Sequence, residues 1–203
     1  MEAQAQMIGR VLRASTVGYD CGTRSSDANE PSFGAFVRAQ RRGESGDIIG
    51  LIYAIRIDDD PLVRQLIMAN NINAATIRDQ RENRMVPIEI SVVNVGYIEA
   101  GMAYYSLPPR PPLSLDPVYL CDETLVRDFT ESFDFFRLIL NTSQVPSEEL
   151  LAAAIKHAVQ ARPAREQRDF LVRAGQKLAA LLSSDLPRLN HLIRLIRPEV
   201  LGI

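Results

Sequence analysis

The first part of the chain alternates between apolar and polar positions with a period of two, which is the pattern of strands with one buried face. Within 86–98, for example, Ile88, Ile90 and Val92 fall on one face. Turn-forming residues separate the strand segments, and 19–32 is one such stretch. Several short strands at this spacing predict a small β-barrel, which closes on itself and leaves no exposed edge. The predicted strands are 7–14, 33–40, 47–57, 86–98 and 102–107.

The segment 62–82, between the third and fourth predicted strands, has a different pattern. Leu62, Leu66 and Ile67 recur at helical spacing, and the pattern breaks near Asn70. We therefore predict a short helical insertion in the barrel.

The second part of the chain has a helical period. Phe129, Phe133 and Phe136 recur at spacings of three or four, which predicts one helix across 122–141. Ser147 is the predicted N-cap of a second helix, because a serine before an amphipathic run can accept from the first backbone N–H groups. Amphipathic helices of this kind need a neighbour to cover their apolar stripes.

Two prolines mark further helix starts. A third helix is predicted after Pro163, and Pro187 opens a fourth. The complete pattern predicts the α+β class, with a small N-terminal β-barrel over 1–121 and a C-terminal α-helical bundle over 122–203.

A proline-rich segment, "YSLPPRPPLSLDPVYLC" over 105–121, joins the two parts. It could be a linker, a docking peptide or a rigid piece of the barrel. Consecutive prolines favour a stiff, extended path, and apolar, strand-like residues flank them. We therefore predict a strut that carries 117–120 to an edge of the barrel and closes it.

Charge and hydropathy exclude some classes of protein. The chain has 203 residues and a net charge of −2, so no global basic field draws it onto nucleic acid or anionic lipid. No apolar run approaches the ~20 residues that span a bilayer. The start has no apolar stretch of the secretory kind, so we predict a cytoplasmic protein with no membrane partner. Residues 146–203 carry nine basic and six acidic residues, a net charge of +3, against −5 for the remainder.

Candidate catalytic and metal-binding residues are few. Cys21 and Cys121 form no CxxC pair, and two free thiols are favoured over a disulfide. Asp58–Asp60 are adjacent carboxylates, for which a solvated turn is favoured over a cation site. His157 and His191 each lack a second ligand at metal-binding spacing. No phosphate-binding GxxxxGK[ST] or GxGxxG motif occurs. We predict no enzyme activity, no metal and no cofactor.

Arg162, Arg165 and Arg168 form the candidate contact residues. Their spacing places three guanidinium groups along one side of a helix start. They could neutralise phosphates of a nucleic acid or contact a partner protein. Interspersed acids favour a solvated face with ion pairs along the helix.

Four segments of the first part resemble the HAS-barrel, the small β-barrel of HerA-type DNA translocases and rotary ATP synthases. They are "IGRVLRAS" (8–15), "SGDIIGLIYAI" (45–55), "VNVGYI" (93–98) and "LPPRPPLSLDPVYL" (107–120). The resemblance implies a barrel used for assembly or partner docking. In HerA-type enzymes a RecA-like ATPase follows the barrel. Here the phosphate loop is missing and 122–203 show no alternating strands and helices, so the motor activity does not carry over.

These observations predict a non-catalytic interaction or assembly protein, which docks on or oligomerises with a partner such as a HerA-type ring ATPase. One alternative is a nucleic-acid-binding accessory factor that uses the basic helical tail. The other is an enzyme with a pocket across the junction between the barrel and the helices.

Overall fold

The computed structural model describes residues 6–24, 31–40, 46–57, 87–143 and 145–197. The predicted insertion at 62–82 and the carboxylates of Asp58–Asp60 lie outside the described residues. In the described part the strands are β1 (Met7–Ala14), β2 (Gly18–Arg24), β3 (Phe36–Gln40), β4 (Gly46–Ile57), β5 (Pro87–Glu99), β6 (Met102–Tyr104) and β7 (Pro117–Leu120). The helices are α3 (Glu123–Phe129), α4 (Phe135–Leu140), α5 (Ser147–Gln160), α6 (Ala164–Leu181) and α7 (Leu186–Ile196).

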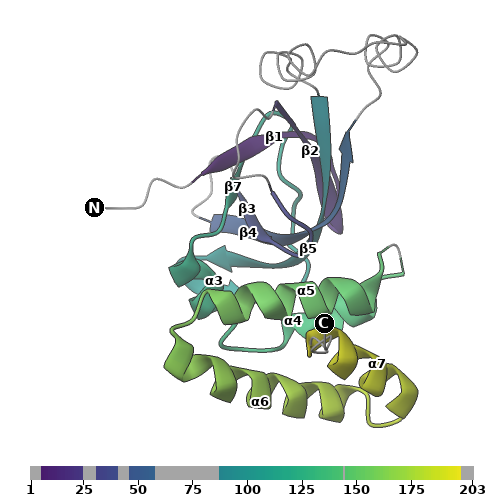
Figure 1. Cartoon of the computed structure of the whole chain (residues 1–203). Coiled ribbons are helices and arrows are strands. Elements are labelled where there is room, and N and C mark those ends of the chain that lie inside the picture. Colours follow the sequence, from purple (N-terminus) through teal and green to yellow (C-terminus); the bar gives the residue numbers. More distant parts are fainter. Residues whose placement is uncertain (1–5, 25–30, 41–45, 58–86, 144, 198–203) are drawn as a thin grey trace, which may run out of the picture.

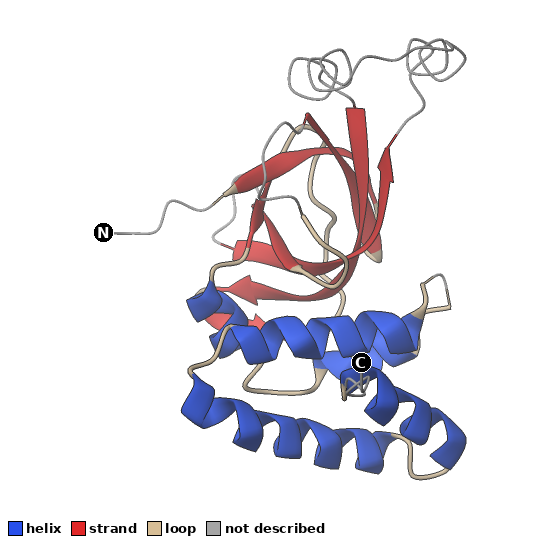
Figure 2. Cartoon of the chain, in the orientation of Figure 1, coloured by secondary structure: helices blue, strands red, loops and turns tan. Residues whose placement is uncertain are grey.

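The strands form a closed antiparallel barrel. Their order is β2-β1-β7-β3-β4-β5, and β2 also pairs with β5, which joins the two ends of the sheet. The short β6 extends β5 as a hairpin. The helices gather at one end of the barrel (Figure 1, Figure 2). The predicted α+β class, an N-terminal barrel followed by C-terminal helices, is confirmed.

β2 corrects the first part of the turn predicted over 19–32, because 19–24 belong to a strand. Asp20 and Gly22 give these residues a turn-like composition, yet β2 pairs on one side with β1 and on the other with β5. Tyr19 and Cys21 point into the barrel and are buried. A Cβ atom at Gly18 would collide with the Val92 carbonyl of β5, so the glycine permits a close approach of two backbones.

The proline-rich segment closes the barrel, as predicted. The Val11 N–H of β1 donates to the Asp116 carbonyl at 2.9 Å, and the Leu115 N–H donates to the Val11 carbonyl at 2.8 Å. These bonds hold the segment along β1 until β7 begins at Pro117. The expected edge position for 117–120 is wrong, however, because β7 lies between β1 and β3 and pairs with both.

The predicted helix across 122–141 is two helices, because polar side chains bond to the backbone between them. The Thr130 hydroxyl donates to the Val126 carbonyl at 2.7 Å where α3 ends. The Ser132 hydroxyl accepts from the Asp134 N–H at 3.3 Å, just before α4. Such local bonds offer the backbone an alternative to the helix.

Ser147 is not the N-cap that the sequence predicts. It is the first residue of α5, Pro146 holds the N-cap position, and no side chain caps this helix end. The Ser147 hydroxyl instead donates to the Glu148 carboxylate at 3.0 Å. Pro163 precedes α6 and Pro187 lies in the first turn of α7, so both predicted helix starts are confirmed.

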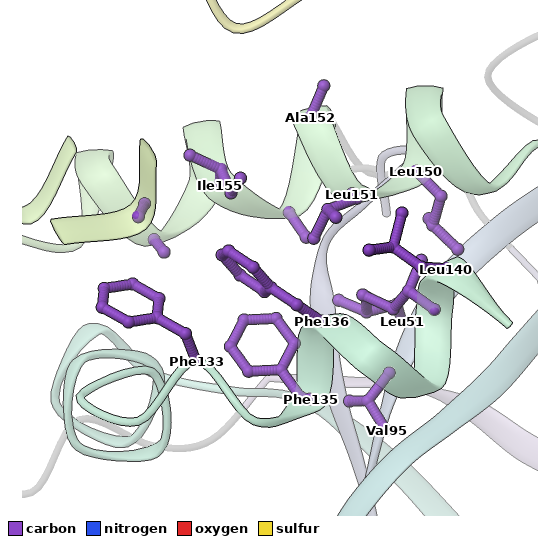
Figure 3. Packing of buried hydrophobic residues seen from close by; sticks show 14 of the residues in the cluster. Leu51, Val95, Phe133, Phe135, Phe136, Leu140, Leu150, Leu151, Ala152 and Ile155 are labelled. Atoms are coloured by element: carbon purple, nitrogen blue, oxygen red, sulfur yellow. The ribbon is translucent and has the colours of Figure 1, made fainter. Parts of the chain in front are cut away.

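The barrel and the helices share one hydrophobic core. Leu51 of β4 and Val95 of β5 lie in the same buried cluster as Phe135 and Phe136 of α4 and Leu151 of α5 (Figure 3). A second cluster fills the barrel itself. Sharing a core ties the helical domain to the barrel, because neither surface can separate without exposing apolar area to water.

Gly34 lies where the barrel comes close to α5. Its φ is +81°, a conformation that favours glycine, and an added Cβ atom would collide with Ala153. The loop before β3 therefore rests directly on the helix backbone.

Candidate functional site

Arg162, the first of the three candidate arginines, lies inside the helical domain. Its side chain is 1% exposed. One guanidinium nitrogen donates to the Thr130 hydroxyl at 2.9 Å and to the Ala158 carbonyl at 2.8 Å. The other donates to the Arg127 carbonyl at 3.1 Å and to Glu131 at 3.0 Å. Arg162 thus ties the end of α5 to the end of α3.

The guanidinium plane of Arg162 also stacks on an aromatic ring. Its central carbon lies 3.8 Å from the centroid of Phe170. Burial lowers the pKa of Arg162 from its ordinary value, and the hydrogen bond that Arg162 donates to Glu131 opposes that shift. Glu131 also accepts from Arg173 at 3.3 Å. The prediction of three guanidinium groups along one side of a helix start is therefore wrong for Arg162, whose side chain is buried.

Arg165 and Arg168 are exposed on α6. Arg165 pairs with its neighbour Glu166 at 3.2 Å, and Arg173 pairs with Asp169 one turn earlier at 3.0 Å. These are ion pairs along a solvated helix, as the interspersed acids suggested. A contact of Arg165 or Arg168 with a partner or nucleic acid stays a prediction.

A hollow of about 260 Å³ between the barrel and α5 brings together residues that are far apart in the sequence. Ser32, Cys121, Glu123 and His157 all line it. His157 Nε2 lies 3.4 Å from the Ser32 hydroxyl and 3.3 Å from the Phe33 carbonyl. No sequence motif signals this grouping, because the residues come from three separate segments.

The chemistry of this hollow does not suit a cysteine nucleophile. Cys21 and Cys121 are free thiols, as expected. Burial raises the pKa of Cys121 well above its ordinary value and raises the pKa of Cys21 to about 12. Burial also lowers the pKa of His157. Both thiols therefore stay protonated at neutral pH, whereas the nucleophile of such a site is the thiolate.

Both cysteines should resist alkylation in the folded protein. We expect no modification by iodoacetamide at pH 8 over a time in which glutathione reacts fully, because the raised pKa of both thiols suppresses thiolate formation and Cys21 is also buried. In urea both should react. Mass spectrometry of the intact protein measures the result, and rapid labelling of native Cys121 would contradict this account of the hollow.

Two adjoining hollows lie beside the turn between β1 and β2, at the junction with the helices. Their volumes are about 280 and 300 Å³, and Val17, Val93 and Thr142 line both. Arg13 and Asp20, the charged residues of the smaller hollow, are bonded to each other at 2.7 Å. These hollows present no converging acid and base of the kind that an enzyme needs. Within the described ranges no three His, Cys, Asp or Glu side chains gather as a metal site.

An apolar groove between α6 and α7 is larger than these three hollows, with a volume of about 510 Å³. We call it the α6–α7 groove. α7 turns back from the end of α6 (Figure 1). Ile155 of α5 and Ile193 and Ile196 of α7 line the groove together with residues of α6. Its lining residues are Ile155, Arg168, Leu171, Val172, Ala174, Gly175, Leu178, Ile193, Ile196 and Arg197.

The walls of the groove expose large apolar side chains to water. Leu171 is 38% exposed, Val172 52% and Ile193 40%, while Ala174 and Leu178 beneath them are buried. An exposed apolar surface with a charged rim is typical of a protein interaction site. Only the packing of α6 against α5 shows that part of the apolar stripe of α6 is left uncovered.

Gly175 lies in the interior of α6 and faces open space in the groove. A Cβ atom added there would meet no other atom within 4 Å. A glycine inside a helix costs about 1 kcal/mol relative to alanine, and packing among the described residues does not explain it. A bare backbone at this point would allow another molecule to approach closely.

Replacing Gly175 by alanine should therefore stabilise the protein. We expect the free energy of unfolding to rise by about 0.5–1 kcal/mol, because the unfolded chain loses freedom and nothing clashes in the fold. Urea denaturation followed by circular dichroism measures this change in the free energy of unfolding. A loss of stability would show that the glycine serves the fold and not an open surface.

Two arginines flank the groove, Arg168 on α6 and Arg197 after α7. Of the residues that the structure describes, none that lines the groove is acidic. Among the described residues, neither arginine takes part in an ion pair. The rim is thus positively charged.

Comparison with known protein families finds no match to the chain, and no curated protein sequence matches it either. No helix of the described part is long and apolar enough to cross a membrane.

Proposed function

We propose that the protein is a non-catalytic interaction and assembly protein whose α6–α7 groove binds a helix of a partner protein. The observation that carries this proposal is the exposed apolar groove of about 510 Å³ at Leu171, Val172 and Ile193. Helix-in-groove binding buries an apolar stripe of the partner in such a surface.

The remainder of the fold supports this role. Each of the six strands that close the barrel pairs with a neighbour on both sides. The core that the barrel shares with α4 and α5 makes a rigid base for α6 and α7. The resemblance of the barrel segments to the HAS-barrel favours a ring-shaped ATPase of the HerA type as the partner. The protein would then contribute assembly, and the partner would contribute the motor.

Two glutamine variants test the proposal. Gly175→Gln fills the groove, whereas Ala179→Gln adds the same side chain on an exposed part of α6 outside it. We expect a partner captured from a lysate of the source organism by the wild-type chain and by Ala179→Gln to be lost with Gly175→Gln. With the purified partner, calorimetry should show at least about ten-fold weaker binding to Gly175→Gln.

The nucleic-acid alternative loses one of its three contact residues, because Arg162 is buried. Equal binding of the captured partner by both glutamine variants would contradict a role for the groove and leave the function to another surface.

A further inference from the structure

We infer that the partner segment is an amphipathic helix with acidic side chains beside its apolar stripe. This inference rests on the proposed function and names the chemistry of the partner at the same groove. Its basis is the combination of an apolar floor, a bare helix backbone at Gly175 and an arginine on each wall.

The charges around the groove point to an acidic partner. Arg168 and Arg197 line it, while the nearest acids of α6 are engaged elsewhere. Asp169 binds Arg173 at 3.0 Å, and Glu166 binds Arg165 at 3.2 Å. Carboxylates at the edges of a docked helix would supply the missing counter-charges. Complementary rim charges set partner choice and association rate more than affinity.

The same charges disfavour a second copy of this chain in the groove. A symmetric dimer would place the groove of one copy on the groove of the other. Arg168 and Arg197 of each copy would then meet arginines across the interface. Like charges brought together at an interface are unfavourable.

Gly175 favours a helix as the docked element. A glycine on a helix surface lets the backbone of a second helix come closer than any side chain would allow. The exposed Leu171 and Val172 on one wall and Ile193 on the other would then enclose the apolar stripe of that helix.

Three peptides of about five helical turns test the inference. They share one stripe of leucine and alanine and carry glutamate, glutamine or lysine beside it. Fluorescence anisotropy measures their binding to the full chain. At low salt we expect the glutamate peptide to bind about ten-fold more tightly than the lysine peptide, with the glutamine peptide between them, and high salt should shrink the difference.

Charge reversal of the two groove arginines tests the inference, and the same reversal outside the groove is its matched control. Arg168→Glu with Arg197→Glu should invert the preference, so that the lysine peptide binds best. Arg165→Glu with Arg194→Glu makes the same change in net charge outside the groove and should leave the preference for glutamate in place. Gly175→Gln should abolish binding of every peptide.

Other outcomes overturn the inference. Equal binding of all three peptides, lost on Gly175→Gln, would keep the groove as a docking site but contradict the acidic partner. Binding that Gly175→Gln does not change, or no binding at all, would remove the proposed function as well. Binding that appears only when residues 198–203 are removed would make the chain's own C-terminal segment the occupant.

Discussion

Replacing Arg162 by alanine should lower the free energy of unfolding by about 3 kcal/mol. The substitution removes the donors to the Thr130 hydroxyl and to the carbonyls of Ala158 and Arg127, and the first two of these bonds are buried. It also removes the group that stacks on Phe170. Denaturant unfolding followed by circular dichroism measures the loss.

Two further variants separate the contributions at this position. Arg162→Lys keeps the charge but not the planar fork, and should recover only part of the stability. Arg165→Ala removes an exposed arginine three residues away and should change the stability by less than about 0.5 kcal/mol. Equal effects of Arg162→Ala and Arg165→Ala would show that Arg162 is not a structural tie.

Replacing Phe136 by alanine should cost about 4 kcal/mol, because the ring is fully buried in the core that the barrel and the helices share. Its centroid lies 4.9 Å from that of Phe135 and 5.2 Å from that of Phe133, so a large cavity would remain. Leu113→Ala, at an exposed position of the proline-rich segment, is the control and should have little effect.

The number of unfolding transitions also tests whether the barrel and the helices share one core. Circular dichroism reports mainly on the helices, whereas amide signals of β4 in NMR spectra report on the barrel. Both probes should show one transition at the same denaturant concentration, since the two parts share their core. A barrel that stays folded after the helices melt would contradict a single cooperative unit.

Much of the fold could be predicted because the period of the hydrophobic positions and the turn residues between them report on local structure. The β-branched run of β4 and the alternation of β5 identify strands without knowledge of their neighbours. β2 could not be predicted in this way. Gly18 and Gly22 are typical of turns, and the stretch becomes a strand only because β1 and β5 lie on either side of it.

The candidate site was harder to predict than the fold. Three arginines at similar spacing look alike in the sequence, yet Arg162 is buried against Phe170 while Arg165 is exposed. The burial of Arg162 depends on α3, which is remote from it in the chain. The α6–α7 groove was missed for the same reason, because an apolar stripe does not show which part of it a neighbour will cover. Gly175 was the local signal that could have indicated it.

The central claim is that the α6–α7 groove binds a partner helix. Methyl NMR of the full chain, titrated with the glutamate peptide, tests it most directly. The account predicts that the methyl signals of Leu171, Val172 and Ile193 shift as the peptide binds, while those of Leu113 in the proline-rich segment do not. Shifts confined to the barrel, with the groove signals unchanged, would contradict it.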